Sequence, residues 1–555
     1  MVNARRPPRT RGLIALVAVA SLAASCGGGD DSGSEPADDE GTEVTASAGA
    51  GADVTSAGSD AGDGTAGGSV DDGSGASDGD EPSGTFRGAY YVGVSRFDPH
   101  KATSSFDNTL LFITYDRLVH QAPDASPVPG LAESWEFDED GSSLTFTLRE
   151  GVTFHDGETF DAEAVKANIE RAQTVEGSAV VSELAVIDSV EVVDASTVRF
   201  DLNGPAASLP LILSDRAGAM VSPAAFENPD LDTSPVGAGM FTVTSYTEGA
   251  SVSYAAYDDY WDPDALRVEG IEMQIQADSA TRLNAIRTGQ IDWTFVDQNQ
   301  VDDAEAAGLT LLPTFTLSSQ HLQLNRSNEY FGDPLVRQAI NHAIDRESIV
   351  ETLLFGQGSA AWQIFPEGYF AHDPDAASYP YDPDRARELL AEAGYPDGFS
   401  FEMVTSTIPA RVQTAEAIQA QLGQIGIEMS ISQVPGAQIA DIFYAQEQND
   451  AMWASWGGRP DPSQTLALLY GADGFANPGD QTTPEMEEAI AATLAVQSED
   501  ERTDSIREAV RIAQEEALDV VLFYESIAFV YAEDRVGGLE RWFSAKPEFR
   551  GVTAG

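Results

Sequence analysis

Cysteine is almost absent from this sequence, since Cys26 is the only one in 555 residues. A single thiol excludes an internal disulfide framework and any zinc or iron-sulfur site built on several cysteines. Histidine is also scarce, and five of the six histidines, all but His155, are scattered without the spacing of metal ligands. We therefore expect neither a metal site nor another cofactor.

Lysine is the second rarity, with Lys101, Lys166 and Lys546 the only three. The chain has 30 Lys and Arg against 91 Asp and Glu, which gives a formal net charge of −61. Such a chain repels phosphate backbones and anionic bilayers, so nucleic acid is excluded as a partner. The imbalance reflects either adaptation to salt or the coding bias of a GC-rich genome, and the sequence does not choose between them.

The sequence also lacks an apolar run long enough to span a membrane. Leu13 to Ala24 is apolar except for Ser21, but it is shorter than the roughly 20 residues of a spanning helix. Four arginines precede this run, and small residues and Cys26 follow it. This order predicts an export signal over residues 1–26.

The residues before Cys26 resemble a bacterial lipobox, although Leu22 lies one place upstream of the usual leucine. The resemblance implies that the signal is removed before Cys26, which then becomes the acylated first residue. Acyl chains would hold the protein to a membrane by roughly 0.8 kcal/mol per buried methylene. The alternative is that Cys26 merely follows an ordinary cleavage site.

Residues 27–84 carry fifteen Asp or Glu but no Lys, Arg or aromatic residue. This composition cannot form a core, so we expect a disordered tether that reaches about 40 to 45 Å. Within it, "GASDG" around Ser77 matches the nucleophile elbow of hydrolases. The match lacks the flanking strand and helix, so we interpret it as chance.

The remaining residues, 85–555, alternate between strand and helix patterns. Apolar residues alternate in 143–148 and 197–202, which predicts strands. Asp161, Asp278 and Asp382 each precede an apolar pattern of helical spacing, as N-cap residues do. The pattern predicts mixed α/β domains.

Several phrases occur in an order that is more specific than any one of them. They are "RFDPHKATSSFDNTLLFITYDRLVHQ", "VPGLAESWEFDEDGSSLTFTLREGVTFHDGETFDAEAVKANIERA", "SPVGAGMFTVTSYTEGASVSYAAYDDYWD", "LVRQAINHAIDRESIVETLLFGQG" and "YPYDPDRARELLAEAGYPDGF". Together they resemble the family 5 extracellular solute-binding proteins of ABC importers, which serve dipeptides, oligopeptides and nickel complexes among others. The resemblance covers essentially all of residues 85–555.

This resemblance implies an α/β, two-lobe, periplasmic-binding-protein-like fold (type II, cluster C) with an inserted domain. The chain would cross a hinge between the lobes twice, so that the lobes close around a ligand. The implied limits are 85–118, 232–316 and 515–555 for lobe I, 119–231 for the inserted domain and 317–514 for lobe II.

The stretch "AMWASWGGRPDPSQTLALLY", residues 451–470, is the most informative about the ligand. In peptide-binding relatives a tryptophan and glycines line the ligand here, and the aspartate that follows pairs with its ammonium. Trp456, Gly457 and Gly458 match, but Arg459 stands in the place of the aspartate. A guanidinium suits carboxylates, phosphates or carbonyl oxygens instead. Two alternatives are a salt bridge of Arg459 at the cleft rim, and a shifted register in which Asp461 is the acid.

The resemblance also implies ligand contacts from other segments. Ser104, Ser105 and Phe106 belong to a lobe I segment that reaches the ligand, Trp362 would add an aromatic wall, and Arg411 lies near a carboxylate-binding arginine of relatives. For each of these residues the alternative is packing.

"TFHDGETF" sets His155 near Asp156 and Glu158, which suits either metal ligands or a turn at Gly157. In the family the same phrase is a turn of the inserted domain, so we expect a structural role.

These observations predict a non-enzymatic receptor, anchored by lipid to the outer face of the cell membrane or periplasmic. It would capture a small solute and deliver it to an ABC permease with its ATPase subunits, as a monomer. One alternative is a sensor that passes ligand occupancy to a membrane partner. Another, a secreted hydrolase acting through His155 or Ser77, lacks a partner base at plausible spacing.

Overall fold

The computed structural model describes residues 81–446, 448–495, 498–540 and 548–555. The expected signal, Cys26 and nearly all of the expected tether lie outside these residues. Among the helices of the described residues, none has the length and apolar character needed to cross a bilayer.

An 11-stranded mixed sheet is the main element, and residues from distant parts of the chain supply its two ends. Its order is β15-β14-β16-β12-β17-β11-β1-β10-β9-β8, and β13 pairs with β17 off this path. The strands are β1 (Thr85–Tyr90), β8 (Phe241–Thr247), β9 (Ser251–Ala256), β10 (Gly270–Ile275), β11 (Trp293–Val296), β12 (Thr310–Leu324), β13 (Gly358–Ala360), β14 (Ser400–Ser406), β15 (Glu428–Val434), β16 (Ala451–Trp456) and β17 (Val520–Tyr531).

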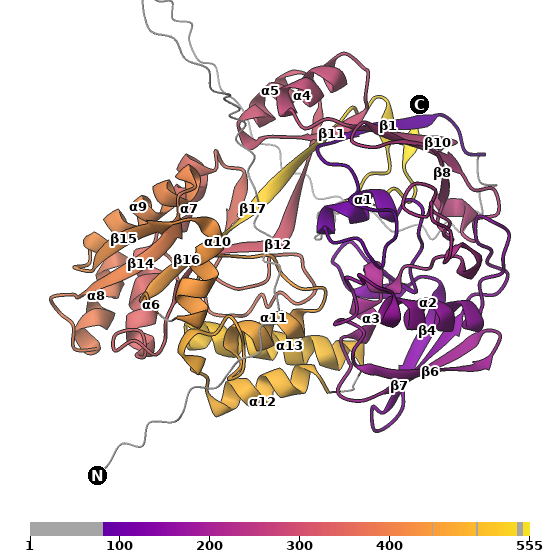
Figure 1. Cartoon of the computed structure of the whole chain (residues 1–555). Coiled ribbons are helices and arrows are strands. Elements are labelled where there is room, and N and C mark those ends of the chain that lie inside the picture. Colours follow the sequence, from indigo (N-terminus) through magenta and orange to yellow (C-terminus); the bar gives the residue numbers. More distant parts are fainter. Residues whose placement is uncertain (1–80, 447, 496–497, 541–547) are drawn as a thin grey trace, which may run out of the picture. The chain divides into compact units, whose positions relative to one another are not determined.

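The long strands β12 and β17 run side by side and join the two ends of the sheet (Figure 1). Their antiparallel pairing is interrupted between Phe315 and Ser319. Since an irregular ladder bends more easily than a continuous one, we expect a hinge here, beside the limit at 316. On β17 the matching point lies between Tyr524 and Ser526, C-terminal to the limit expected at 515.

Helices pack beside the end of the sheet that β14, β15 and β16 form. One apolar core, which includes Leu322, Ile340 and Phe401, binds helices to these strands, and a second core includes Phe443, Leu466 and Ile506. The helices of this part are α6 (Pro334–Ala343), α7 (Arg346–Leu353), α8 (Pro383–Glu392), α9 (Pro409–Gly423), α10 (Gly436–Ala440), α11 (Pro462–Tyr470), α12 (Pro484–Thr493) and α13 (Glu499–Glu515).

The other end of the sheet has fewer and shorter helices. Phe86, Trp293 and Phe529 belong to its core. The helices are α1 (Asn108–Leu111), α4 (Ser279–Arg287) and α5 (Val301–Ala306), and a small strand pair is formed by β18 (Val536–Gly537) and β19 (Thr553–Ala554).

A separate four-stranded antiparallel sheet, in the order β4-β5-β7-β6, is formed by the segment expected to be inserted. Phe146 and Phe200 lie fully buried in its core, as the alternating patterns predict. The elements of the whole segment are β2 (Val119–Gln121), β3 (Pro127–Pro129), β4 (Ala132–Phe137), β5 (Ser143–Leu148), α2 (Ala162–Thr174), β6 (Ile187–Asp194), β7 (Thr197–Leu202) and α3 (Leu209–Ile212).

The three predicted helix starts are confirmed. The carboxylates of Asp161, Asp278 and Asp382 each accept a hydrogen bond from the backbone N–H three residues further on. Each therefore satisfies one of the backbone donors that a helix leaves free at its N-terminus.

Candidate functional site

The carboxyl ends of parallel strands gather the arginines expected at the site. Strand β14 is parallel to both β15 and β16, so the three strands end at one edge of the sheet. Arg411 lies in the first turn of α9 after β14, and Arg459 follows β16 by three residues. In open α/β sheets, ligands bind outside this kind of edge.

The other end of the sheet offers a matching edge, because β1 is parallel to β10 and β11. Tyr91 directly follows β1, and its ring meets those of Phe106 and Phe295 at 5.3 and 4.9 Å between centroids. Arg282, in α4 after β10, lies over the Phe295 ring at 4.3 Å. Phe106 keeps 37% of its surface exposed, so this aromatic group offers an uncovered ring.

Trp456, Gly457 and Gly458 form the turn after β16, beside the interruption in β12. Gly458 has a φ of +71°, and a Cβ placed on it would lie 2.5 Å from that of Leu317. A Cβ on Gly457 would meet no atom within 4 Å. The fold therefore requires glycine at the second position, whereas the first borders open space.

Arg459 lies beside Trp456, with its guanidinium carbon 5.4 Å from the centre of the indole. Burial lowers the pKa of Arg459, and the charge of Glu183 in the inserted segment opposes that shift. Within the described residues, no hydrogen bond and no carboxylate within 4 Å holds the guanidinium. Arg459 is thus half-buried and positively charged, with acceptor-binding capacity left over.

Arg411 is in a similar situation. Burial lowers its pKa and the charge of Glu525 opposes that shift. In the described part of the chain its guanidinium likewise has no hydrogen bond and no carboxylate within 4 Å.

Asp461, the alternative acid, is fully buried and serves the fold. Its carboxylate caps α11 by accepting from the Ser463 N–H at 2.9 Å, and it binds Arg502 at 2.7 and 2.8 Å. A carboxylate committed to these partners is not available to a ligand. This arrangement argues against the alternative in which a shifted register makes Asp461 the acid that pairs with the ligand. The proposed site therefore does not include Asp461.

The lobe I segment around Ser104 lies next to the aromatic group of Tyr91. The Ser104 hydroxyl accepts from the Phe106 N–H at 3.2 Å and caps the short 3-10 helix Ser105–Asp107. Phe106 is thus presented outward beside Tyr91, and contact of this segment with a ligand stays a prediction.

Trp362 lines an open hollow of about 420 Å³ together with residues of α7 and β13, among them Glu347 and Glu351. Its indole N–H donates to the carbonyl of Tyr379 at 2.8 Å. Strand β13 pairs with β17, so the hollow borders the crossing strands. Among the described residues, no hydrogen bond or ring contact joins Trp362 to Arg411 or Arg459, so its role as an aromatic wall of the site stays a prediction.

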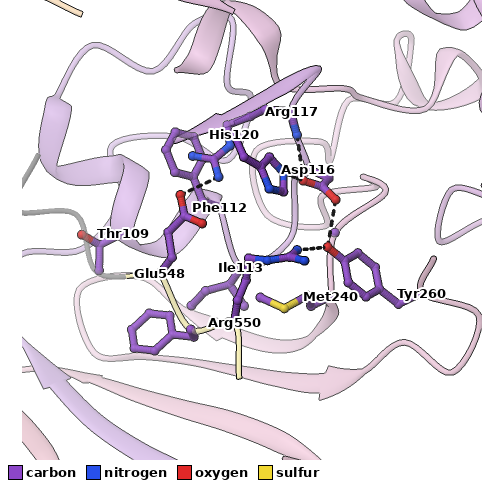
Figure 2. Close-up of a pocket in the computed structure, with 12 residues that line it drawn as sticks. Thr109, Phe112, Ile113, Asp116, Arg117, His120, Met240, Tyr260, Glu548 and Arg550 are labelled. Carbon is purple, nitrogen blue, oxygen red and sulfur yellow. Dashed lines mark hydrogen bonds and ion pairs between the residues drawn. The ribbon is translucent and has the colours of Figure 1, made fainter. Parts of the chain in front are cut away.

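A second hollow, under the C-terminal residues, is too small to hold a solute. It encloses only about 10 Å³, which is room for about one water molecule. Figure 2 shows Asp116 among the lining residues, where its carboxylate accepts from Tyr260 and binds His120, while Arg117 binds Glu548 at 2.6 Å. These contacts satisfy buried charges and fasten the C-terminal residues.

The histidine turn has the structural role that we expect. The His155 Nε2–H donates to the carbonyl of Gly239 at 2.9 Å, and burial lowers the pKa of the ring. Across the described residues, no three His, Cys, Asp or Glu side chains gather as metal ligands would.

Glu525 is a candidate that we did not single out from the sequence. It is the one charged residue of strand β17, "VVLFYESIAFVY", and its side chain is exposed between the buried Tyr524 and Ser526. A lone charge inside an apolar strand was the signal available in the sequence.

Comparison with known proteins agrees with this geometry. A family model described as "Bacterial extracellular solute-binding proteins, family 5 Middle" matches residues 126–477. The glutathione-binding protein GsiB of Salmonella paratyphi A is 29% identical over 455 residues, which cover 79% of this chain and 89% of that protein.

Solved structures share the fold. HbpA2 from Haemophilus parasuis is 26% identical, with a TM-score of 0.78 over 85% of this chain and 100% of that one. NikA from Brucella suis, in complex with Fe(III)-EDTA, is 26% identical with a TM-score of 0.71 over the same shares.

Proposed function

Because this chain belongs to the bacterial extracellular solute-binding proteins of family 5, the non-catalytic substrate-binding proteins of ABC importers, we propose that it captures a small organic solute and delivers it to a permease with its ATPase subunits. The mixed α/β fold of periplasmic binding proteins, expected from the sequence, is confirmed by the structural likenesses. We further propose that the lobes close about the β12–β17 interruption, near the limit expected at 316 on β12 and beyond the limit expected at 515 on β17.

The ligand proposal rests on the burial and the missing hydrogen-bond partners of the Arg411 and Arg459 guanidinium groups. Each guanidinium is partly withdrawn from water at the carboxyl edge of the sheet, without a hydrogen-bond partner among the described residues. Leaving such groups unsatisfied costs free energy, which a ligand acceptor would recover. We infer that the solute presents anionic or acceptor groups to these arginines, against Trp456 and Gly457 and opposite Ser104, Ser105 and Phe106.

The names of relatives give a range of solutes of this kind. One relative is named for glutathione, another was solved with the peptide STSA, and a third with a nickel-histidine complex. Each of these ligands carries carboxylate groups, so peptides and related organic acids are the first class to test.

A thermal-shift panel of peptides, organic acids, sugars and metal chelates tests the proposal. A ligand at 100 times its Kd stabilises the folded protein by about 2.7 kcal/mol. We expect an anionic compound to do so, and Arg459→Glu to abolish the effect, while Arg387→Glu on the exposed face of α8 preserves it. Chemical conversion of a bound compound, or a panel without any response, would contradict the proposal.

The membrane attachment has its own test. We propose that Cys26 carries the lipid, so the Cys26→Ser protein should leave the membrane fraction while the intact protein stays in it. Equal release of both proteins would show that Cys26 only follows a cleavage site.

A further inference from the structure

We propose that Arg411 and Glu525 together form a subsite for a zwitterionic amino acid head group, and that Arg459 binds a second acid group of the same solute. The α-carboxylate would bind Arg411, and the α-ammonium would bind Glu525. This inference rests on the proposed function and narrows it to one class of substrate.

The register of three neighbouring strands places Glu525 at the candidate site. Tyr524 pairs with Ser319, and Ser319 pairs with Trp456, so these residues form one row across the sheet. Glu525 and Gly457 are the next residues beyond that row on the same side. With strands about 4.8 Å apart, the backbones of Tyr524 and Trp456 in that row lie roughly 10 Å from each other, a distance that a small solute spans.

The Glu525 side chain is left uncovered by its neighbours. Its partner on strand β13 is Gly358, which has no side chain to lie over it. The adjacent Tyr524 and Ser526 are buried while Glu525 is exposed, because successive side chains of a strand point to opposite faces. The carboxylate is therefore open to an arriving ligand.

Arg411 and Glu525 influence each other without closing into an ion pair. The charge of Glu525 raises the pKa of Arg411, and the charge of Arg411 lowers the pKa of Glu525. No contact within 4 Å joins the two side chains. Partial burial disfavours the charged form of each group, since it lowers the pKa of Arg411 and raises that of Glu525. Two opposite charges that are partly dehydrated and kept apart leave a gap that a ligand with both signs of charge can fill.

The two charges also select against simpler solutes. A dicarboxylate would satisfy Arg411 but would place a like charge near Glu525, and a simple amine would leave Arg411 without an acceptor. A group that carries both a carboxylate and an ammonium, as an amino acid head group does, supplies both counter-charges at once. Arg459, whose guanidinium lies against Trp456, presents its planar fork to a second acid.

A matched series of ligands tests the inference by titration calorimetry. The reference is γ-L-glutamylglycine; glutarylglycine lacks its ammonium, 4-aminobutyrylglycine lacks its α-carboxylate, and γ-L-glutamylglycinamide lacks its second acid. β-L-Aspartylglycine and succinylglycine repeat the ammonium comparison with one methylene fewer. We expect one of the two zwitterionic compounds to bind at least tenfold more tightly than each analogue that lacks a group.

Variants of the protein assign each group to a residue. Glu525→Gln should reduce the preference for the ammonium to about onefold, and Arg411→Gln should do the same for the α-carboxylate. Glu388→Gln, an exposed control on α8, should preserve both preferences, and circular dichroism verifies that each variant is folded. Equal binding of glutarylglycine and the reference by the wild-type protein, or an unchanged preference in Glu525→Gln, would overturn the inference.

The outcomes also separate this inference from the function on which it rests. If neither zwitterionic compound binds but another solute of the wider panel does, the inference fails and the proposed function stands. If no solute of any class binds, both fail.

Discussion

Asp461 and Arg502 form a buried ion pair between the N-terminus of α11 and α13, with the Arg502 Nη2 atom 2.7 and 2.8 Å from the two carboxylate oxygens. Asp461 is fully buried and Arg502 is 4% exposed. Arg502 also donates to the carbonyl of Thr493 at 3.1 Å. The pair thus joins the three helices α11, α12 and α13.

Removing one partner of this pair should destabilise the protein strongly. We expect Asp461→Ala to lower the free energy of unfolding by about 3 to 5 kcal/mol, because it leaves the Arg502 charge buried and uncompensated. Urea unfolding measures the loss, and Asp384→Ala, at an exposed pair with Arg387, should change it by less than about 1 kcal/mol. A small loss of stability combined with a large loss of ligand affinity would instead return Asp461 to the binding site.

Gly457 and Gly458 should respond differently to the same substitution. Gly458→Ala places a methyl group against Leu317 at a positive φ, so we expect a loss of about 1 to 3 kcal/mol in unfolding free energy. Gly457→Ala meets no atom, so stability should change by less than about 1 kcal/mol. If the ligand lies over this turn, Gly457→Ala should weaken its binding at least tenfold, by calorimetry. Loss of affinity in neither variant would argue against a ligand here.

His100 makes the folded protein sensitive to acid. Its Nδ1 accepts from Arg171 at 2.8 Å and its Nε2–H donates to the Ala219 carbonyl at 3.3 Å. Burial, reinforced by the charge of Arg171, lowers the pKa of His100 from 6.5 to about 4. The folded ring is therefore neutral where the unfolded ring already binds a proton.

The resulting pH dependence is confined to one window. Between pH 6.5 and about 4 the unfolded state holds one proton more at His100, so the free energy of unfolding falls as the pH falls, by about 3 kcal/mol in total. His100→Gln keeps a donor and an acceptor but does not titrate, so its urea midpoint should fall less steeply across this window. Parallel pH profiles of the two proteins would contradict the assignment.

Salt should stabilise the folded protein. The formal net charge of −61 is distributed over the whole chain, and repulsion between like charges opposes the compact state. Raising the ionic strength from about 0.01 to about 1 M shortens the screening length from roughly 30 to 3 Å, so the melting temperature should rise. Calorimetry in KCl measures this, with sucrose as an uncharged control. A lower melting temperature in KCl would mean that attractive ion pairs outweigh the repulsion.

Local elements follow from the sequence where the physical cause is local. Asp161 caps its helix through a backbone N–H three residues away, and the alternation in residues 143–148 buries Phe146. The fold was identified through the resemblance of the ordered phrases to a family. Each of these phrases encodes a turn, cap or strand in its own residues. The same resemblance located the turn from Trp456 to Arg459 as part of the candidate site.

What only the tertiary structure decided concerns charges with partners far along the chain. The sequence offered Asp461 as a possible ligand acid, but its partner is Arg502, which packing brings to it from another helix. The sequence left Glu525 unnoticed, whereas the structure exposes its side chain between the buried Tyr524 and Ser526, and the charge of Arg411 acts on its pKa. Helix caps and strand alternation depend on neighbours in sequence, and the sequence alone determines them. Whether a charged side chain is neutralised inside the protein or left for a ligand depends on which distant groups the fold brings near it, because electrostatic interactions and burial act through space.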